Sequence, residues 1–172
     1  MQEIHLVGIN HKTSRVSDRE RFIVVDSNLI YLNDFLISKL EKKISGFFGL
    51  STCNRTELYF YGDKDIEDDV LKLTKEALNI SDIPNKNFYI YNGLKALEHM
   101  SRVCCGIDSQ VIGEQEIFGQ FKNAYNSAKA FNIVGKELMI YVEKVFEITK
   151  KVRTETKIGI NPLSVSGLSF NL

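Results

Sequence analysis

The stretch GFFGLSTCNRTELYFY, residues 46–61, decides the fold class. It places a polar segment, 51–56, between two short runs that are rich in aromatic and aliphatic residues. Runs of this length and composition on either side of turn-forming residues predict two β-strands, over 46–50 and 57–61. The first half of the chain is therefore expected to contain a sheet.

Alternating strand and helix patterns surround this pair. Residues 3–9 and 88–91 are short β-prone runs and predict two more strands. Apolar residues at helical spacing predict helices over 28–44 and 65–78, and the second opens with an acidic turn. From residue 94 the pattern is helical, with apolar stripes over 94–104, 117–131 and 138–152. We expect an α+β fold: a small, mostly antiparallel sheet with packed helices, followed by a helical half.

The composition is that of one ordinary globular domain. Its 172 residues are 44% hydrophobic and 26% charged, which excludes a disordered tail, a collagen-like repeat and a disulfide-dense secreted scaffold. Because 22 Lys+Arg balance 22 Asp+Glu, any contact with nucleic acid must come from a local patch. An odd cysteine count, no signal-peptide pattern and no apolar run of 18 residues predict a cytoplasmic protein without a membrane span.

Cys53 is the most informative candidate for chemistry. It lies in the polar segment, with hydroxyls, an amide and the Arg55 guanidinium as neighbours, whereas a structural cysteine usually has apolar ones. Thiols react as thiolates, and a nearby cation raises the ionised fraction. A reactive thiol and a merely exposed one remain equally good interpretations. Arg55 itself suits either a carboxylate or a phosphate.

Other candidate sites give weaker signals. Cys104 and Cys105 follow an apolar helical face and are expected to be packed. No C-x-x-C or H-x-x-x-H pair indicates a metal site, and no Rossmann or Walker A loop indicates a nucleotide site. His99 falls beside the apolar stripe of its helix, and its spacing does not place it near Cys53.

Two further stretches allow both a structural and a binding interpretation. Residues 106–120 interleave three glycines with polar side chains and form either a tight helix junction or a polar binding loop. The end of the last helix is basic, which suits the helix dipole or a phosphate contact. Its cations are Lys144, Lys150, Lys151, Arg153 and Lys157.

Taken together, four blocks of sequence resemble the N-terminal catalytic domain of the glutamyl-tRNA reductases. They are GINHKT (8–13) with the following Arg19-Glu20, STCNRTE (51–57), the segment from His99 to Tyr125 that includes DSQVIGEQEIFGQFKNAY (108–125), and KVRTETKI (151–158). The blocks occur in the family's order and cover nearly the whole chain.

The resemblance implies a mechanism and a set of site residues. Cys53 would be the nucleophile that accepts glutamate from glutamyl-tRNA as a thioester, which NADPH would reduce to glutamate-1-semialdehyde, the first step of five-carbon tetrapyrrole (porphyrin) biosynthesis. His99 would be the active-site histidine, in proton transfer or orientation. The expected substrate-binding residues are Thr52, Asn54, Arg55, Ser109, Glu114, Gln115, Glu116 and Gln120. The family usually has Gln where this chain has Glu116, and a carboxylate there would repel an anionic substrate.

The resemblance also implies a domain organisation. Residues 1–158 would form the catalytic domain, and 159–172 would begin the connection to an absent NADPH-binding domain. We therefore expect NADPH to bind outside this chain, no metal, and no reduction by the chain alone. Glutamyl-tRNA is the expected partner, with glutamate-1-semialdehyde aminomutase as a candidate acceptor of the product. The family is homodimeric through a further domain that this chain lacks.

Two other functions remain to be distinguished from this one. A degenerate relative would bind tRNA or a protein partner without chemistry, and would have no need of an intact Thr52-Cys53-Asn54-Arg55 block. A thiol esterase acting on another ester would share the nucleophile but would be indifferent to the tRNA.

Overall fold

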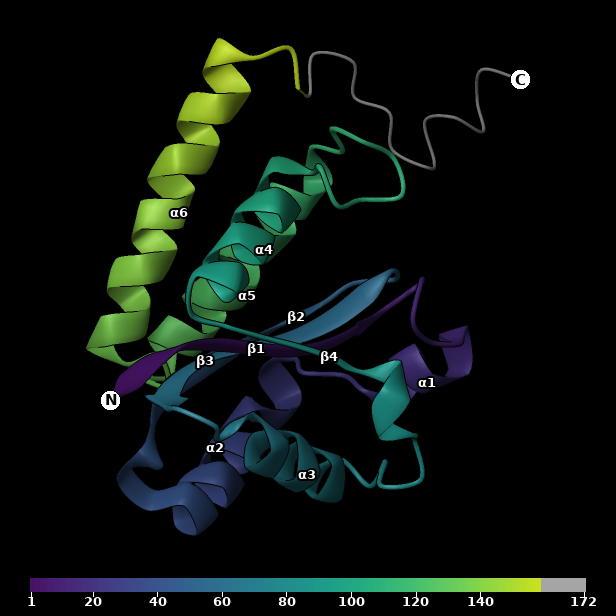
Figure 1. The fold of residues 1–172 in the computed structure, drawn as a ribbon, viewed down its shortest axis with the longest axis vertical. Helices are drawn as coiled ribbons and strands as arrows, with labels where there is room; N and C mark the ends of the chain where they lie inside the picture. Colours follow the sequence, from purple (N-terminus) through teal and green to yellow (C-terminus); the bar gives the residue numbers. More distant parts are fainter. Residues whose placement is uncertain (159–172) are drawn as a thin grey trace.

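The computed structural model describes residues 1–158 (Figure 1). The expected connection at 159–172 lies outside the described residues. In chain order the elements are β1 (Gln2–Asn10), α1 (Val16–Arg21), α2 (Asp26–Leu40), the 3-10 helix η1 (Glu41–Lys43), β2 (Ile44–Ser51), β3 (Arg55–Asp63), α3 (Glu67–Ala77), η2 (Asn85–Asn87), β4 (Tyr89–Asn92), α4 (Gly93–Cys105), α5 (Glu116–Ala130) and α6 (Lys136–Glu155). None of these helices combines the length and apolarity that crossing a membrane requires.

The four strands form one sheet in the order β2-β3-β1-β4, and every neighbouring pair is antiparallel. With α2 between β1 and β2 and α3 between β3 and β4, this is the β-α-β-β-α-β arrangement of ferredoxin-like folds. The expected α+β class and the antiparallel sheet are confirmed.

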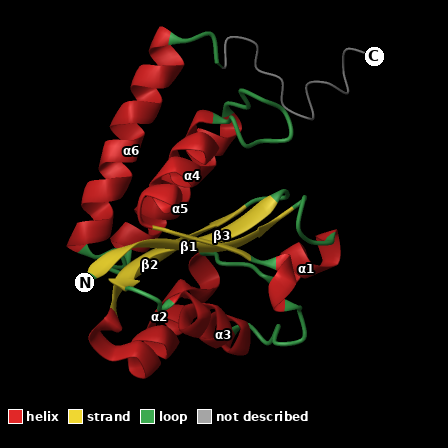
Figure 2. Ribbon diagram, viewed as in Figure 1, coloured by secondary structure: helices red, strands yellow, loops and turns green. Residues whose placement is uncertain are grey.

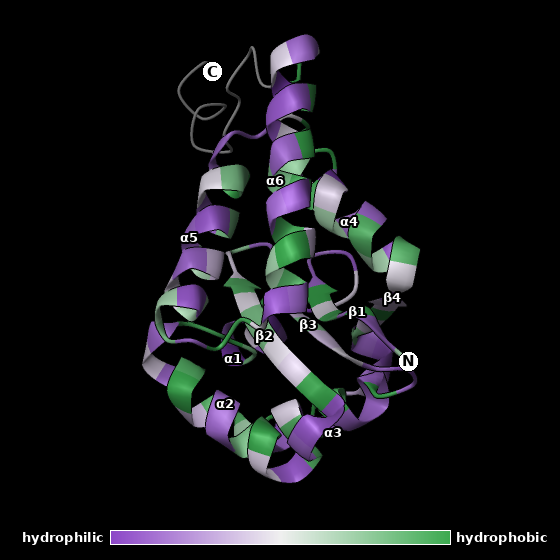
Figure 3. Cartoon of the chain, turned by 90° about the vertical axis from the view of Figure 1, so that its left-hand side faces the viewer, coloured by the Kyte–Doolittle hydropathy of each residue, from purple (hydrophilic) through white to green (hydrophobic). Residues whose placement is uncertain are grey.

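Helices cover both faces of the sheet. α2 and α3 lie against one face, and α4, α5 and α6 form the layer on the other (Figure 2). In Figure 3 hydrophilic residues predominate along α6 and are interrupted by short hydrophobic stretches, as expected of a helix with one covered face. The sheet is consequently covered on both sides, and β2 and β3 are almost continuously buried.

Aromatic packing joins the β2–β3 pair to the helical layer. Phe48 on β2 pairs with Tyr59 on β3 across the ladder, and their rings stack with centroids 5.1 Å apart. On the same face, Phe121 and Tyr125 of α5 meet the Phe48 ring edge-on at 5.4 and 5.7 Å. Such contacts are worth about 0.5–1.5 kcal/mol each beyond the area they bury.

Two predicted features differ from the structure. The helix expected over 28–44 ends at Leu40, and Ile44 instead begins β2, where its side chain is buried in the core. Leu94, expected on the apolar stripe of its helix, is 81% exposed because it lies in the first turn of α4, beyond the edge of the core.

Removing the Phe48 ring should strongly destabilise the fold. We expect Phe48→Ala to lower the free energy of unfolding by about 3–5 kcal/mol, since the side chain is fully buried and its neighbours are held by two layers. Ile30→Ala, on the exposed face of α2, is the matched control and should change it by less than about 0.5 kcal/mol. Urea unfolding measures both, and equal losses would contradict this account of the core.

Candidate active site

The β2–β3 connection is a tight turn with Cys53 at its tip. The Thr52 amide donates to the Arg55 carbonyl at 2.8 Å. The Thr52 hydroxyl accepts the amides of Asn54 and Arg55 at 3.3 and 3.2 Å. The Cys53 side chain is exposed. The turn therefore fixes the backbone around a thiol that is open to solvent.

The loop after β1 supports this turn from the side. The His11 amide donates to the Asn54 carbonyl at 2.9 Å. The buried Arg19 donates through Nε to the Cys53 carbonyl at 3.4 Å and through Nη1 to the Ser14 carbonyl at 2.8 Å. The carbonyls of Cys53 and Asn54 are thus bonded to a second segment, which restrains the thiol's position.

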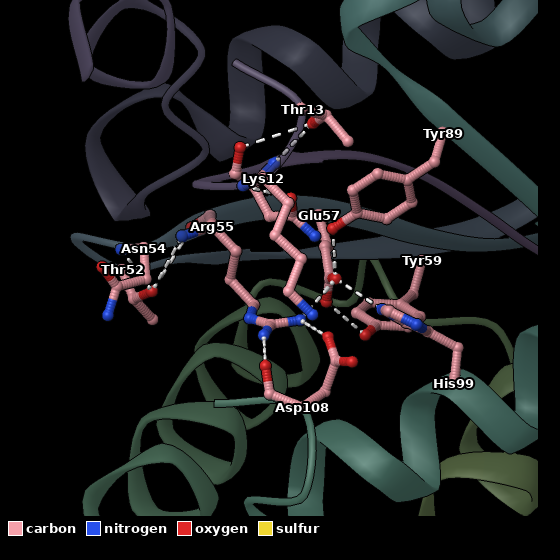
Figure 4. Close-up of polar contacts among 11 residues, drawn as sticks. Lys12, Thr13, Thr52, Asn54, Arg55, Glu57, Tyr59, Tyr89, His99 and Asp108 are labelled. Atoms are coloured by element: carbon pink, nitrogen blue, oxygen red, sulfur yellow. Dashed lines mark hydrogen bonds and ion pairs between the residues drawn. The ribbon is translucent and has the colours of Figure 1, made fainter. Parts of the chain in front are cut away.

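A buried carboxylate, Glu57, lies beneath the turn on β3. Its Oε1 accepts Arg55 Nη1 at 3.0 Å, the Tyr89 hydroxyl at 2.6 Å and His99 Nε2 at 2.6 Å (Figure 4). Its Oε2 accepts the Tyr59 hydroxyl at 2.5 Å. Because an ionised carboxylate only accepts, Nε2 is the His99 nitrogen that carries a proton in this bond.

These contacts keep Glu57 ionised. Burial alone would raise its pKa, but the hydrogen bond and charge of His99, together with the charge of Arg55, outweigh it and lower the pKa to about 2. Burial, followed by the charge of Glu57, raises the pKa values of Tyr59 and Tyr89 well above 10.0. Both phenols therefore stay protonated and remain donors.

Arg55 connects this carboxylate to the loop between α4 and α5. Its Nη1 also reaches Asp108 Oδ2 at 3.1 Å, and its Nη2 donates to the Asp108 carbonyl at 2.6 Å. Burial would lower the pKa of Arg55, but Glu57, the two phenols and Asp108 raise it. Three of the five guanidinium N–H donors are used in these bonds, which leaves two.

The loop over 106–115 is fastened at both ends. Asp108 holds its start through Arg55, while Arg153 Nη2 donates to the Cys104 and Glu114 carbonyls at 3.1 and 3.0 Å. Gly106 has a φ of +77°, and a Cβ there would lie 2.8 Å from the Glu114 carbonyl oxygen. A glycine is therefore required where the two ends of the loop meet.

The expected substrate-binding residues divide into two groups. Thr52, Asn54 and Arg55 lie in or beside the turn. Five others lie along the loop and the start of α5, either half-buried (Ser109, Glu114) or exposed (Gln115, Glu116, Gln120). Gln120 lines a hollow of about 560 Å³ together with Ser51.

The structure links the two expected catalytic residues only indirectly. Within residues 1–158 no hydrogen bond joins Cys53 to His99, and the connection runs through Arg55 and Glu57. Cys104 and Cys105 are buried as predicted, and burial raises the pKa of Cys104. No cluster of three or more His, Cys, Asp or Glu side chains suited to a metal ion occurs in the described part of the chain.

Sequence reasoning missed the residues that organise the site. These are Arg19, Glu57, Tyr59, Tyr89 and Asp108. One signal was present: Glu57 is the single acidic residue in a run of β-prone residues, and a charge in a buried strand needs partners. The long-range contacts, from Tyr89 and His99 to Glu57 and from Asp108 to Arg55, have no signature in spacing along the chain.

Glu57 should make the free energy of unfolding depend on pH in the acid range. The pKa of Glu57 is lowered from 4.5 to about 2. Its ionised form therefore adds on the order of 3 kcal/mol to the free energy of unfolding above pH 4.5, and this contribution is lost as the pH falls toward 2. We expect Glu57→Gln to flatten the fall in unfolding free energy over that range, measured by urea unfolding at each pH. Glu137→Gln, on an exposed helix position, should leave the fall unchanged. An unaltered slope in Glu57→Gln would contradict the assignment.

Asp108 should control the order of the loop. In Asp108→Ala the ion pair with Arg55 is lost, so we expect amide exchange over 106–115 to accelerate by about tenfold, as measured by hydrogen–deuterium exchange. Asp69→Ala, on the exposed face of α3, is the control and should not affect the loop. An unchanged exchange rate in Asp108→Ala would contradict this role and show that Arg153 and the glycines are enough to keep the loop ordered.

Comparison with known proteins identifies the family. The profile of "Glutamyl-tRNAGlu reductase, N-terminal domain" matches residues 7–156. The glutamyl-tRNA reductase of Marinobacter nauticus is 38% identical over 168 residues, which cover 96% of this chain and 38% of that protein. The one from Pseudoalteromonas translucida is 37% identical, covering 96% of this chain and 40% of its own length.

A solved structure agrees with these sequences. Glutamyl-tRNA reductase from Methanopyrus kandleri superposes with a TM-score of 0.73 at 30% identity, covering 91% of this chain and 36% of that one. This chain thus spans about two fifths of the length of the relatives it matches. The chain belongs to the glutamyl-tRNA reductase family, and its residues 7–156 correspond to the family's N-terminal domain.

Proposed function

We propose that this chain binds glutamyl-tRNA and that Cys53 accepts the glutamyl group as a thioester. The observation that carries this proposal is the exposed thiol on a turn braced by Arg19 and underlain by the Arg55–Glu57–His99 network. The name shared by the relatives, glutamyl-tRNA reductase, supports the substrate. Nucleophilic catalysis of this kind divides one difficult acyl transfer into two easier steps.

The proposed step is an acyl transfer. The Cys53 thiolate attacks the ester carbonyl carbon, a carbon–sulfur bond forms, and the bond from that carbon to the ribose oxygen of the tRNA breaks. The released oxygen takes a proton. His99 is the candidate donor or orienting group, because Glu57 holds its Nε2 and leaves Nδ1 for substrate or water.

Recognition of glutamate is proposed for the side chains around the turn and the loop. Arg55 retains two N–H donors of the kind that bind a carboxylate in pairs, but its side chain is only 2% exposed, so direct contact with the substrate requires its bonds to Asp108 to open. Thr52 and Asn54 flank the thiol, and Ser109, Glu114, Gln115, Glu116 and Gln120 follow along the loop and α5. The Glu116 carboxylate is exposed, so solvent weakens its repulsion of an anionic substrate.

The described residues do not suit a dinucleotide. NADPH-binding folds are built on parallel βαβ units with a glycine-rich turn, whereas all strand pairs in residues 1–158 are antiparallel and the sequence has no such turn. We therefore assign substrate binding and thioester formation to this chain, and no reduction step. Dimerisation and transfer of an aldehyde to an aminomutase stay predictions from the family.

Mass spectrometry of the intact chain tests the proposal. After mixing with glutamyl-tRNA and quenching in acid, we expect a glutamyl adduct that maps to Cys53 and is missing in Cys53→Ser. His99→Ala should slow adduct formation by about 10²-fold or more if the imidazole transfers the proton. An adduct on Cys104 or Cys105 would contradict the assignment of the nucleophile. If no adduct forms and the tRNA ester stays intact, the chain is a binding module.

A further inference from the structure

A polar hollow of about 630 Å³ lies beside the supporting loop of the turn. One wall is the segment after β1, and the other is the segment before β4, far away in the sequence. Its lining residues are Lys12, Thr13, Ser14, Arg15, Ser17, Asp18, Pro84, Lys86 and Asn87. Hydroxyls, an amide and cations dominate this set, which is the chemistry that binds phosphate oxygens rather than apolar groups.

The charges in the hollow are unbalanced. Lys12, Arg15 and Lys86 are exposed, and none forms an ion pair with any residue in the described range 1–158. The one carboxylate in the lining, Asp18, accepts the Asn87 amide at 3.1 Å. A chain with no net charge therefore carries a local excess of two positive charges here.

The hollow and the candidate nucleophile share one framework. The guanidinium of Arg19 donates hydrogen bonds both to the carbonyl of Ser14, which lines the hollow, and to the carbonyl of Cys53. His11, next to Lys12, donates its amide to Asn54. In Figure 4 the Lys12 side chain extends from this loop in the direction of the Arg55 guanidinium. The positive residues thus lead from the hollow toward the candidate active site.

We propose that this hollow binds backbone phosphates of the tRNA strand whose end carries the glutamate. The proposal rests on the function proposed above, because a substrate esterified at the end of an RNA strand must bring phosphates close to the thiol it acylates. Phosphate contacts fix the position of a strand without reading its sequence, so they would hold the ester at Cys53. The basic end of α6 is the competing surface.

Binding measurements on paired variants test the site. Arg15→Ala/Lys86→Ala removes two exposed cations from the hollow, and Lys150→Ala/Lys151→Ala removes two from α6 as the matched control. With uncharged tRNA as the probe, we expect the hollow variant to bind about tenfold more weakly at low salt. The slope of log affinity against log salt should fall by roughly 1.4, since each single-strand phosphate contact contributes about 0.7. The α6 variant should match the unaltered chain.

A phosphate-free acyl donor separates this proposal from the function itself. Glutamate α-benzyl thioester can acylate Cys53 by thiol exchange, and we expect the hollow variant to react with it at the unaltered rate. Unchanged tRNA affinity in the hollow variant, or an equal loss in the α6 variant, would overturn the phosphate site even where Cys53 is acylated. If the hollow variant binds tRNA more weakly but the unaltered chain never forms the glutamyl adduct, the result would support the phosphate site and refute the proposed chemistry.

Discussion

The buried charge of Glu57 is the constraint on which the site depends. An unpaired carboxylate in a protein interior costs several kcal/mol, so its position is tenable only while its four donors are in place. Those donors come from β3, β4 and α4, elements that join the sheet to the helical layer. Docking of α4, which supplies His99, therefore completes the set of donors that keeps Glu57 ionised.

This arrangement couples folding to the proposed chemistry. The ferredoxin-like half provides the turn with its thiol, and the helical half contributes His99 and Asp108. Arg55 and Glu57 lie close to the turn on β3, where Arg55 contacts Asp108 and Glu57 contacts His99. Neither half contains the complete site, which forms only where α4, α5 and α6 cover one face of the four-stranded sheet.

The sequence allowed the class of fold to be predicted, because period-two and helical apolar patterns report on burial directly. It was accurate for the strands around the polar turn and for the burial of Cys104 and Cys105. Element ends were harder to predict. The spacing of Ile44 continues the apolar stripe of the preceding helix, yet in the structure Ile44 is the first residue of β2. The long-range partners of Glu57 were beyond prediction from residue spacing, since 32 residues separate it from Tyr89 and 42 from His99.

The burial pattern of the three cysteines has a consequence for reactivity. Cys104 and Cys105 are buried at the end of α4, within the helical layer, whereas Cys53 faces solvent. An alkylating reagent or an oxidant in solution therefore meets a single thiol unless α4 separates from its neighbours. The fold itself gives the chain one chemically addressable position, where a spectroscopic label can be attached without mutating the other two cysteines. Modification of the buried pair would in turn report the opening of the helical layer.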